Sequence, residues 1–234
     1  MATTPDVQKK DEVVTINEKV TDFIQKNRKI LFIGLIALIA VLAGFITVII
    51  VREKVLEKAL SQIDEFNRRY EGVRFEPESD DPYIASKMAE IAYLLVDIEG
   101  FAGRNSGLAS ARAYNLIANI QWDQNNRDAA EKAWLDAAKA AGKNYLAPVS
   151  LYNAAVAAEE RGDVDTAIAY YSRALEHGKI FPSAVRAQFS IGRLEESRNR
   201  KESALEAYRN VLSNWPNDPL WPNLAQSRIL ALSE

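Results

Sequence analysis

The sequence contains few residues that could perform catalytic chemistry. Its only histidine, His177, falls in the last turn of a predicted helix, where the helix dipole favours a cation. A histidine that acts as a general base needs a nucleophile and an orienting carboxylate. The sequence contains no recognisable Ser-His-Asp set, P-loop, G-x-G-x-x-G or H-E-x-x-H motif. We therefore expect neither an enzyme nor a protein that holds a cofactor.

Four carboxylates gather in the segment 72–82, at Glu76, Glu78, Asp80 and Asp81. Carboxylate oxygens are ligands for Ca²⁺ and Mg²⁺, but this spacing lacks the central glycine and the final glutamate of an EF-hand loop. The chain has no cysteine, which excludes disulfides and thiolate zinc sites. We therefore predict a solvated acidic loop and no metal site.

The charge distribution argues against a nucleic-acid partner. The chain of 234 residues has a net charge of −3, and residues 52–234 carry 23 Lys/Arg against 27 Asp/Glu. Nucleic-acid binding depends on a surplus of cations that neutralise phosphates. The chain is 48% hydrophobic, so it can bury a substantial core. The function must therefore be sought in the arrangement of its structural elements, and not in a reactive cluster.

Residues 30–51 form a continuous apolar run, ILFIGLIALIAVLAGFITVIIV, without a charged side chain. As a helix this run is about 33 Å long, which is enough to cross a bilayer core of about 30 Å. A buried core helix usually keeps a polar face, which this run lacks. A cleaved signal peptide has a shorter apolar run and a small-residue cleavage site, and neither is present. We therefore predict a transmembrane helix that acts as a retained signal anchor.

The charges beside the span predict its orientation. Four cations flank it on the N-terminal side and three on the C-terminal side: Lys19, Lys26, Arg28 and Lys29, then Arg52, Lys54 and Lys58. By the positive-inside rule, we expect residues 1–29 to be a cytoplasmic tail. The large C-terminal domain would then lie in the periplasm, outside the inner (cytoplasmic) membrane.

The predicted tail contains a short amphipathic segment. Its apolar side chains fall on one helical face: Val13, Ile16, Val20, Phe23 and Ile24. Two interpretations stay open. The segment is an interfacial helix that lies on the inner leaflet or docks on a membrane partner, or it is a helix that continues from the span.

Comparison of the sequence with itself reveals a repeat of 37 residues. The repeat is defined by an alanine, an aromatic residue four positions later and a small or β-branched residue three positions after that: Ala130, Trp134 and Ala137, then Ala167, Tyr171 and Ala174, then Ala204, Tyr208 and Val211. Upstream of each alanine lies another aligned position, occupied by Ala118, Ala155 and Gly192. Small residues let two helices cross closely, and the aromatic residue is expected to fill the gap toward the next pair. Such pairs bury their apolar faces by stacking.

The middle copy, residues 151–175, reads LYNAAVAAEERGDVDTAIAYYSRAL and resembles the tetratricopeptide consensus. Gly162 stands at the turn between the two helices, and the second helix carries the signature positions Ala167, Tyr171 and Ala174. The resemblance implies an all-α fold in which antiparallel helix pairs stack into a right-handed superhelix. We expect a degenerate first pair over 52–104, three repeats over 105–216 and a capping helix over 217–234. The period exceeds the family's 34 residues, and we place the extra residues in turns at Gly142 and Gly178.

In tetratricopeptide arrays the first helices of successive pairs line the concave face. Aligning the three copies places nine residues there: Arg112, Asn115, Asn119, Tyr152, Asn153, Val156, Arg186, Phe189 and Arg193. Some members of the family bind a partner's C-terminal carboxylate with Asn and Lys/Arg side chains, and Asn119, Asn153 and Arg186 match these residue types. Asn115 and Ser190 depart from the pattern, so Arg193 is expected to substitute. The alternative is that all nine are ordinary solvated residues of helix surfaces.

An N-terminal anchor followed by a small tetratricopeptide domain resembles the bacterial family of ancillary subunits of the Sec translocon. That resemblance implies a periplasmic repeat domain that contacts translocon and chaperone components. Two hypotheses follow. The first is a chaperone-linked accessory factor that binds emerging chains transiently, and the second is a permanent scaffold in an envelope or motor assembly. In both, the partners are proteins and the membrane, without a small-molecule substrate.

Overall fold

The computed structural model describes residues 5–74 and 83–233. Within these ranges every regular element is a helix and no strand occurs, which confirms the predicted all-α class. The chain divides into two compact units, one up to Glu57 and one from Lys58. The predicted acidic loop, with its four carboxylates, lies outside the described residues.

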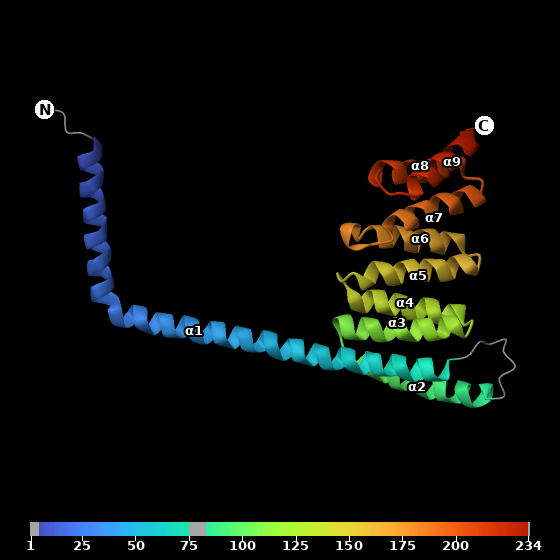
Figure 1. Cartoon of the computed structure of the whole chain (residues 1–234), viewed down its shortest axis with the longest axis horizontal. Coiled ribbons are helices and arrows are strands. Elements are labelled where there is room, and N and C mark those ends of the chain that lie inside the picture. Colours follow the sequence, from blue (N-terminus) through green and yellow to red (C-terminus); the bar gives the residue numbers. More distant parts are fainter. Residues whose placement is uncertain (1–4, 75–82, 234) are drawn as a thin grey trace. The chain divides into compact units, whose positions relative to one another are not determined.

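The first unit consists of most of a single long helix, α1 (Pro5–Val73), which continues into the second unit (Figure 1). No proline occurs between Pro5 and Pro77, so no residue in between lacks the N–H that the helix requires. The predicted tail helix, the apolar span and the helix after the span are therefore one continuous helix. The side chains before Glu18, on which part of the amphipathic face falls, lie outside the described part of the chain.

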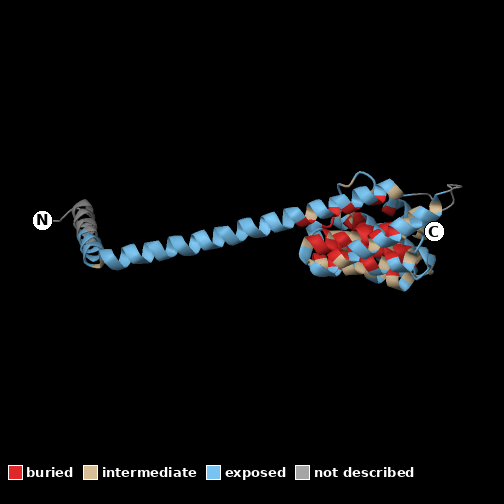
Figure 2. Cartoon of the chain, turned by 90° about the horizontal axis from the view of Figure 1, so that it is seen from below, coloured by how far each residue is buried: buried red, intermediate tan, exposed pale blue. Residues whose placement is uncertain are grey.

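The apolar run of α1 is exposed on all sides. Its large hydrophobic side chains, from Ile30 to Val51, are 42–70% exposed, and Figure 2 shows this stretch in continuous pale blue. The hydroxyl of Thr47 donates to the carbonyl of Ala43 at 2.8 Å, so it needs no partner outside the helix. By length and composition, α1 is a candidate membrane span, the one such helix among the described residues. An apolar surface of this length would be costly in water.

The second unit is a stack of helix pairs in chain order (Figure 1). The C-terminal part of α1 packs on α2 (Ile84–Arg104), with the ring centroids of Phe66 and Phe101 5.7 Å apart. Three further pairs and a final helix follow: α3 (Gly107–Asp123) with α4 (Arg127–Ala141), α5 (Leu146–Glu160) with α6 (Val164–Leu175), α7 (Ala184–Ser197) with α8 (Lys201–Asn214), and α9 (Trp221–Ser233). A short 3-10 helix, η1 (Gly178–Ile180), connects α6 to α7.

The turns inside these three pairs share one backbone conformation. Asn125, Gly162 and Asn199, spaced 37 residues apart, have φ angles of 64°, 79° and 57°. Glycine adopts this left-handed conformation without steric cost, and asparagine tolerates it better than most residues. The turn at Gly162 was predicted, whereas its two asparagine equivalents were not. After Gly162, the Asp163 carboxylate accepts a hydrogen bond from the N–H of Thr166 at 3.2 Å, which caps α6 and lowers the pKa of Asp163.

Alanine makes up about half of the buried hydrophobic residues of the stack, which form the red band in Figure 2. Side chains this small let the helices approach closely. Helix α3 also contacts α5, and α7 contacts α9, across the second helix that lies between them in the chain. The place of the first helices on the concave face stays a prediction from the repeat resemblance.

Candidate binding groove

The residues that define the repeat lie between the two helices of each pair. Eight of them are at most 4% exposed: Ala130, Trp134, Ala137, Ala167, Tyr171, Ala174, Ala204 and Tyr208. The Tyr171 ring lies 5.3 Å from that of Tyr152, and the Tyr208 ring lies 5.2 Å from that of Phe189. The aromatic residue of a second helix therefore packs on the first helix of its own pair. The sequence indicated a role toward the next pair only.

The helix crossing is tightest at Gly192. A Cβ atom added there would lie 2.6 Å from Cε1 and 2.7 Å from Cδ1 of Tyr208, well inside van der Waals contact. The equivalent positions hold Ala118 and Ala155, both fully buried. The absence of a side chain at Gly192 therefore allows the large ring of Tyr208 to lie directly on the α7 backbone.

A hydrogen-bonded chain of three side chains ties the second pair to the third. The Tyr171 hydroxyl donates to the Glu159 carboxylate at 3.2 Å. Arg193, from the first helix of the next pair, forms an ion pair with the same carboxylate. Burial raises the pKa of Tyr171, so the tyrosine stays neutral and continues to donate at physiological pH.

The same arrangement recurs between the third pair and α9. The Tyr208 hydroxyl donates to Glu196 at 2.9 Å, and Arg228 of α9 forms an ion pair with this glutamate. Burial raises the pKa of Tyr208, whereas the hydrogen bonds from Arg228 lower the pKa of Glu196. The last helix is therefore fixed to the stack by charge as well as by apolar packing.

The nine predicted groove residues lie on the first helices α3, α5 and α7, but their exposure differs. Three are exposed, five are half-buried and one is buried: Asn119, Arg186 and Arg193, then Arg112, Asn115, Asn153, Val156 and Phe189, and finally Tyr152. Tyr152 is 9% exposed, because Tyr171 and Phe181 pack on its ring at 5.3 and 6.0 Å. Little of its surface is left for a partner.

The arginines of this face differ in their electrostatic partners. Arg193 is engaged by Glu159. The Arg186 guanidinium lies 5.6 Å over the Tyr152 ring, and neither Arg186 nor Arg112 forms an ion pair or hydrogen bond with a described residue. The Oδ1 atom of Asn115 is buried, also without a hydrogen-bond partner in the described ranges. The face therefore keeps unpaired donors and an unpaired acceptor side by side along the stack.

The groove extends beyond the predicted residues onto α1. A pocket of about 250 Å³ lies between α1 and α3, lined by Asn67, Tyr70, Glu71, Arg74, Leu116, Asn119, Trp122 and Asp123. Asp123 accepts a hydrogen bond from Tyr70 at 2.7 Å and pairs with Arg74 at 3.1 Å. Burial raises the pKa of Tyr70. The apolar spacing that ends at Tyr70 could have located this helix face from sequence, but not its pairing with Asp123.

Comparison with known proteins agrees with this geometry. The family model described as tetratricopeptide repeat matches residues 115–178 and 152–219. Residues 115–219 therefore match tetratricopeptide repeats. A protein of Treponema pallidum (strain Nichols), called TPR repeat-containing protein, is 28% identical over 228 residues, which cover 92% of this chain and 93% of that protein.

Two solved tetratricopeptide domains are similar to part of the chain. The TPR domain of Arabidopsis OM64 has a TM-score of 0.43 and 20% identity, and covers 53% of this chain and 97% of its own. The first TPR of Spaghetti (RPAP3), bound to the HSP90 peptide SRMEEVD, has a TM-score of 0.44 and 21% identity, and covers 55% and 99%. Each covers little more than half of this chain.

Within the described ranges, the tetratricopeptide repeats assemble no group of three or more His, Cys, Asp or Glu side chains that could hold a metal ion. The lone His177 follows α6, which ends at Leu175, so its predicted place in the last helical turn is wrong. Its N–H bonds to the carbonyl of Ala174 at 3.2 Å, a tighter turn than the α-helix makes. What the described repeats offer chemically is recognition by hydrogen bonds and charge.

Proposed function

We propose that the chain is a membrane-anchored protein-interaction module whose concave groove binds an extended acidic segment of a partner. Stacked repeats create extended concave surfaces that suit this task. The observation that carries the proposal is a row of polar side chains on the first helices with no hydrogen bond or ion pair to a described residue: Arg112, Asn115, Asn119, Asn153 and Arg186.

These unpaired arginines contrast with several others in the stack. Elsewhere, arginines join neighbouring pairs through carboxylates: Arg127 to Glu160, Arg161 to Asp128 and Glu131, and Arg198 to Asp165. Arg112 and Arg186 occupy equivalent positions two repeats apart, and neither pairs with a carboxylate of a described residue. A buried oxygen without a partner, such as Oδ1 of Asn115, costs about 1–3 kcal/mol. A fold that keeps such an atom on a concave face sacrifices stability in a way typical of binding sites.

The chemistry of the groove selects the partner segment. A carboxylate, from an acidic side chain or a chain terminus, would accept charge-assisted hydrogen bonds from Arg186. The amides of Asn119 and Asn153 would bind the backbone of the extended segment. Arg193 was expected to share the carboxylate, but its ion pair with Glu159 makes Arg186 the better candidate. A charged hydrogen bond contributes about 1.5–3 kcal/mol, or roughly ten- to a hundredfold in affinity.

The proposal places this module on a membrane through residues 30–51 of α1. Support comes from the apolar surface of that stretch, which is exposed on all sides, and from the cations that flank it. With the N-terminus in the cytoplasm, the repeats lie in the periplasm. The partner is then a component of the secretion machinery or a periplasmic chaperone, in keeping with the resemblance to ancillary translocon subunits.

The test uses the full-length chain in its native membranes. A photo-crosslinking residue at Asn153, followed by mass spectrometry, identifies the partner. Affinity for that partner is then measured with the Arg186→Ala chain and with the matched control Arg209→Ala, an exposed arginine on α8. We expect a ten- to hundredfold loss for Arg186→Ala and no change for the control.

Unchanged affinity in Arg186→Ala and Asn153→Ala, with an unchanged melting temperature, would contradict binding in the groove. Many weakly bound clients would favour an accessory factor, and one stoichiometric partner would favour a scaffold. Resistance of the chain to a carbonate wash tests the anchor. Protease access to residues 52–234 only from the cytoplasmic side would reverse the proposed orientation.

A further inference from the structure

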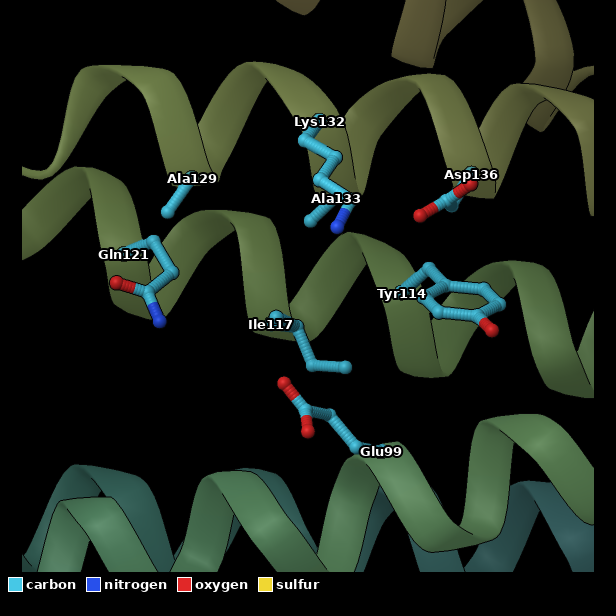
Figure 3. A pocket seen from close by; sticks show the side chains of 8 residues that line it. All are labelled: Glu99, Tyr114, Ile117, Gln121, Ala129, Lys132, Ala133 and Asp136. Atoms are coloured by element: carbon cyan, nitrogen blue, oxygen red, sulfur yellow. The ribbon is translucent and has the colours of Figure 1, made fainter.

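A second candidate surface lies on the side of α3 opposite the groove. A cleft of about 380 Å³ opens between α2 and α4, with α3 as its floor (Figure 3). Eight residues line it: Glu99 from α2, then Tyr114, Ile117 and Gln121 from α3, then Ala129, Lys132, Ala133 and Asp136 from α4. Successive residues of a helix are about 100° apart. Positions 114, 117 and 121 therefore face away from the groove positions 112, 115 and 119.

We call the space over α3 between α2 and α4 one interval, and the equivalent space over α5 between α4 and α6 the next interval. The cleft exists because the first interval lacks a side chain that the next interval has. Ala133 is equivalent to Tyr170, 37 residues further on. Tyr170 is half-buried between α4 and α6, where it packs against the core and its hydroxyl donates to Glu131 at 3.3 Å. At position 133 the alanine leaves the corresponding volume open above Ile117.

The same comparison shows how the charge of the cleft differs. Glu99 on α2 is equivalent to Asp136 on α4, one repeat of 37 residues later. In the same way, Asp136 on α4 is equivalent to Arg173 on α6. The next interval therefore has a carboxylate on one wall and an arginine on the other, and the Arg173 guanidinium lies 5.7 Å from the centre of the Tyr170 ring. The cleft has a carboxylate on both walls, and its lining adds one cation, Lys132.

These three charges are unpaired. Neither Glu99, Asp136 nor Lys132 forms an ion pair or hydrogen bond with a described residue. In Figure 3 the Glu99 carboxylate points from α2 toward Ile117, and Asp136 lies beside Tyr114. The cleft thus lacks both the ring and the guanidinium that complete the next interval.

We propose that the cleft receives a basic side chain, an arginine above all, from a partner protein. Its aliphatic stem would pack on Tyr114 and Ala129, because Ile117 and Ala133 at the base of the cleft are only 4% and 6% exposed. Its guanidinium would lie between Glu99 and Asp136. One arginine then replaces the volume of Tyr170 and the charge of Arg173. The site is separate from the groove, which selects acidic segments, so it stands whether or not the groove binds.

The experiment uses the full-length chain in detergent micelles, with isotope-labelled isoleucine and alanine methyl groups observed by NMR. The probe is N-acetyl-arginine amide, and the control is its neutral isostere, N-acetyl-citrulline amide. We expect saturable shifts of the Ile117, Ala129 and Ala133 methyls with the arginine probe only, and weaker binding at high salt.

Three variants and one control variant sharpen the test. Glu99→Gln and Asp136→Asn should each weaken the arginine probe about two- to fivefold, whereas Glu206→Gln, on the exposed surface of α8, should not. Ala133→Tyr should fill the cleft and abolish the shift of Ile117. If Ala133→Tyr does not fold, the affinities of Glu99→Gln and Asp136→Asn for the arginine probe still test the proposal.

Equal shifts with both probes, no saturable shift, or unchanged affinity in the Glu99→Gln, Asp136→Asn double variant would overturn the proposal. A shift of the same methyls that depends on protein concentration without a probe would assign the cleft to a second copy of the chain, and would also overturn it.

Discussion

Replacing Gly192 by alanine would place one methyl group where the structure has no room. The new Cβ atom would lie 2.6, 2.7 and 3.0 Å from three ring atoms of Tyr208, although carbon atoms in contact lie about 3.5–4 Å apart. The ring cannot easily move aside. It is fully buried, its hydroxyl is bonded to Glu196 at 2.9 Å, and it packs on Phe189 at 5.2 Å. The methyl group must therefore push α7 and α8 apart.

Two effects of the Gly192→Ala change oppose each other. Overpacking a closely packed core costs about 1–3 kcal/mol. Alanine is the better helix former, by about 1 kcal/mol. Because Tyr208 is held at both its ring and its hydroxyl, we expect overpacking toward the upper end of its range. The net loss in the free energy of unfolding is then about 1–2 kcal/mol. At about 2–4 °C per kcal/mol for a unit of this size, the melting temperature should fall by roughly 2–8 °C.

The assay is thermal unfolding of the full-length chain in micelles, followed by the fluorescence of Trp215 and Trp221, which pack in the same cluster as Tyr208. Gly103→Ala is the matched control, since Gly103 is also helical and an added Cβ would meet nothing within 4 Å. We expect it to be neutral or up to about 1 kcal/mol stabilising. A Gly192→Ala chain as stable as the control would refute the close crossing of α7 and α8, and with it the role assigned to this position of the repeat.

Three further predictions concern polar groups. Asn115→Leu removes a buried unpaired oxygen and should raise the free energy of unfolding by about 1 kcal/mol in denaturant titrations, while it weakens partner binding. A loss of stability would contradict the assignment of Oδ1 of Asn115 as a buried oxygen without a partner. The raised pKa of Tyr208 means that its neutral form stabilises the fold below pH 10, a contribution lost as the pH rises through the folded-state value. Alkaline unfolding should therefore be shallower in Tyr208→Phe, as followed by ultraviolet difference spectroscopy. The pKa of Glu196 is lowered from 4.5, so its contribution is present above pH 4.5 and lost as the pH falls below it. Acid unfolding of Glu196→Gln should show a weaker pH dependence. An unchanged curve would mean that the ion pair between Glu196 and Arg228 does not contribute to the pH dependence of stability.

The packing of the repeats could be predicted from sequence because it obeys strict spacing. A small residue at a helix crossing has few alternatives, so Ala130, Ala167 and Ala204 stand out at the 37-residue period. The turn partners of Gly162 were missed because asparagine also adopts the left-handed conformation. Asn125 and Asn199 become recognisable only once their shared spacing from Gly162 is considered.

The electrostatics could not be predicted, because pairing depends on which side chains the stacking brings together. Arg193 and Arg186 look alike in sequence, yet Glu159, 34 residues before Arg193, engages only the former. The groove on α1 was missed for the same reason, since Tyr70 and Asp123 are 53 residues apart. No local pattern links such residues.

In a repeat protein, positions that agree between copies and positions that differ carry different information. Agreement, as at Tyr171 and Tyr208 with their glutamates, satisfies the needs of stacking, which every pair shares. A difference at an equivalent position cannot serve that common need, so it leaves the local surface incomplete. Position 133 holds alanine where the equivalent position 170 holds tyrosine, and a cleft stays unfilled there. Positions 112 and 186 hold arginines without a carboxylate partner among the described residues, so their charge stays unpaired. Both incomplete places are on opposite faces of the stack and opposite in charge. Under the two proposals, one module would hold an acidic and a basic partner surface at the same time and would thereby link two proteins.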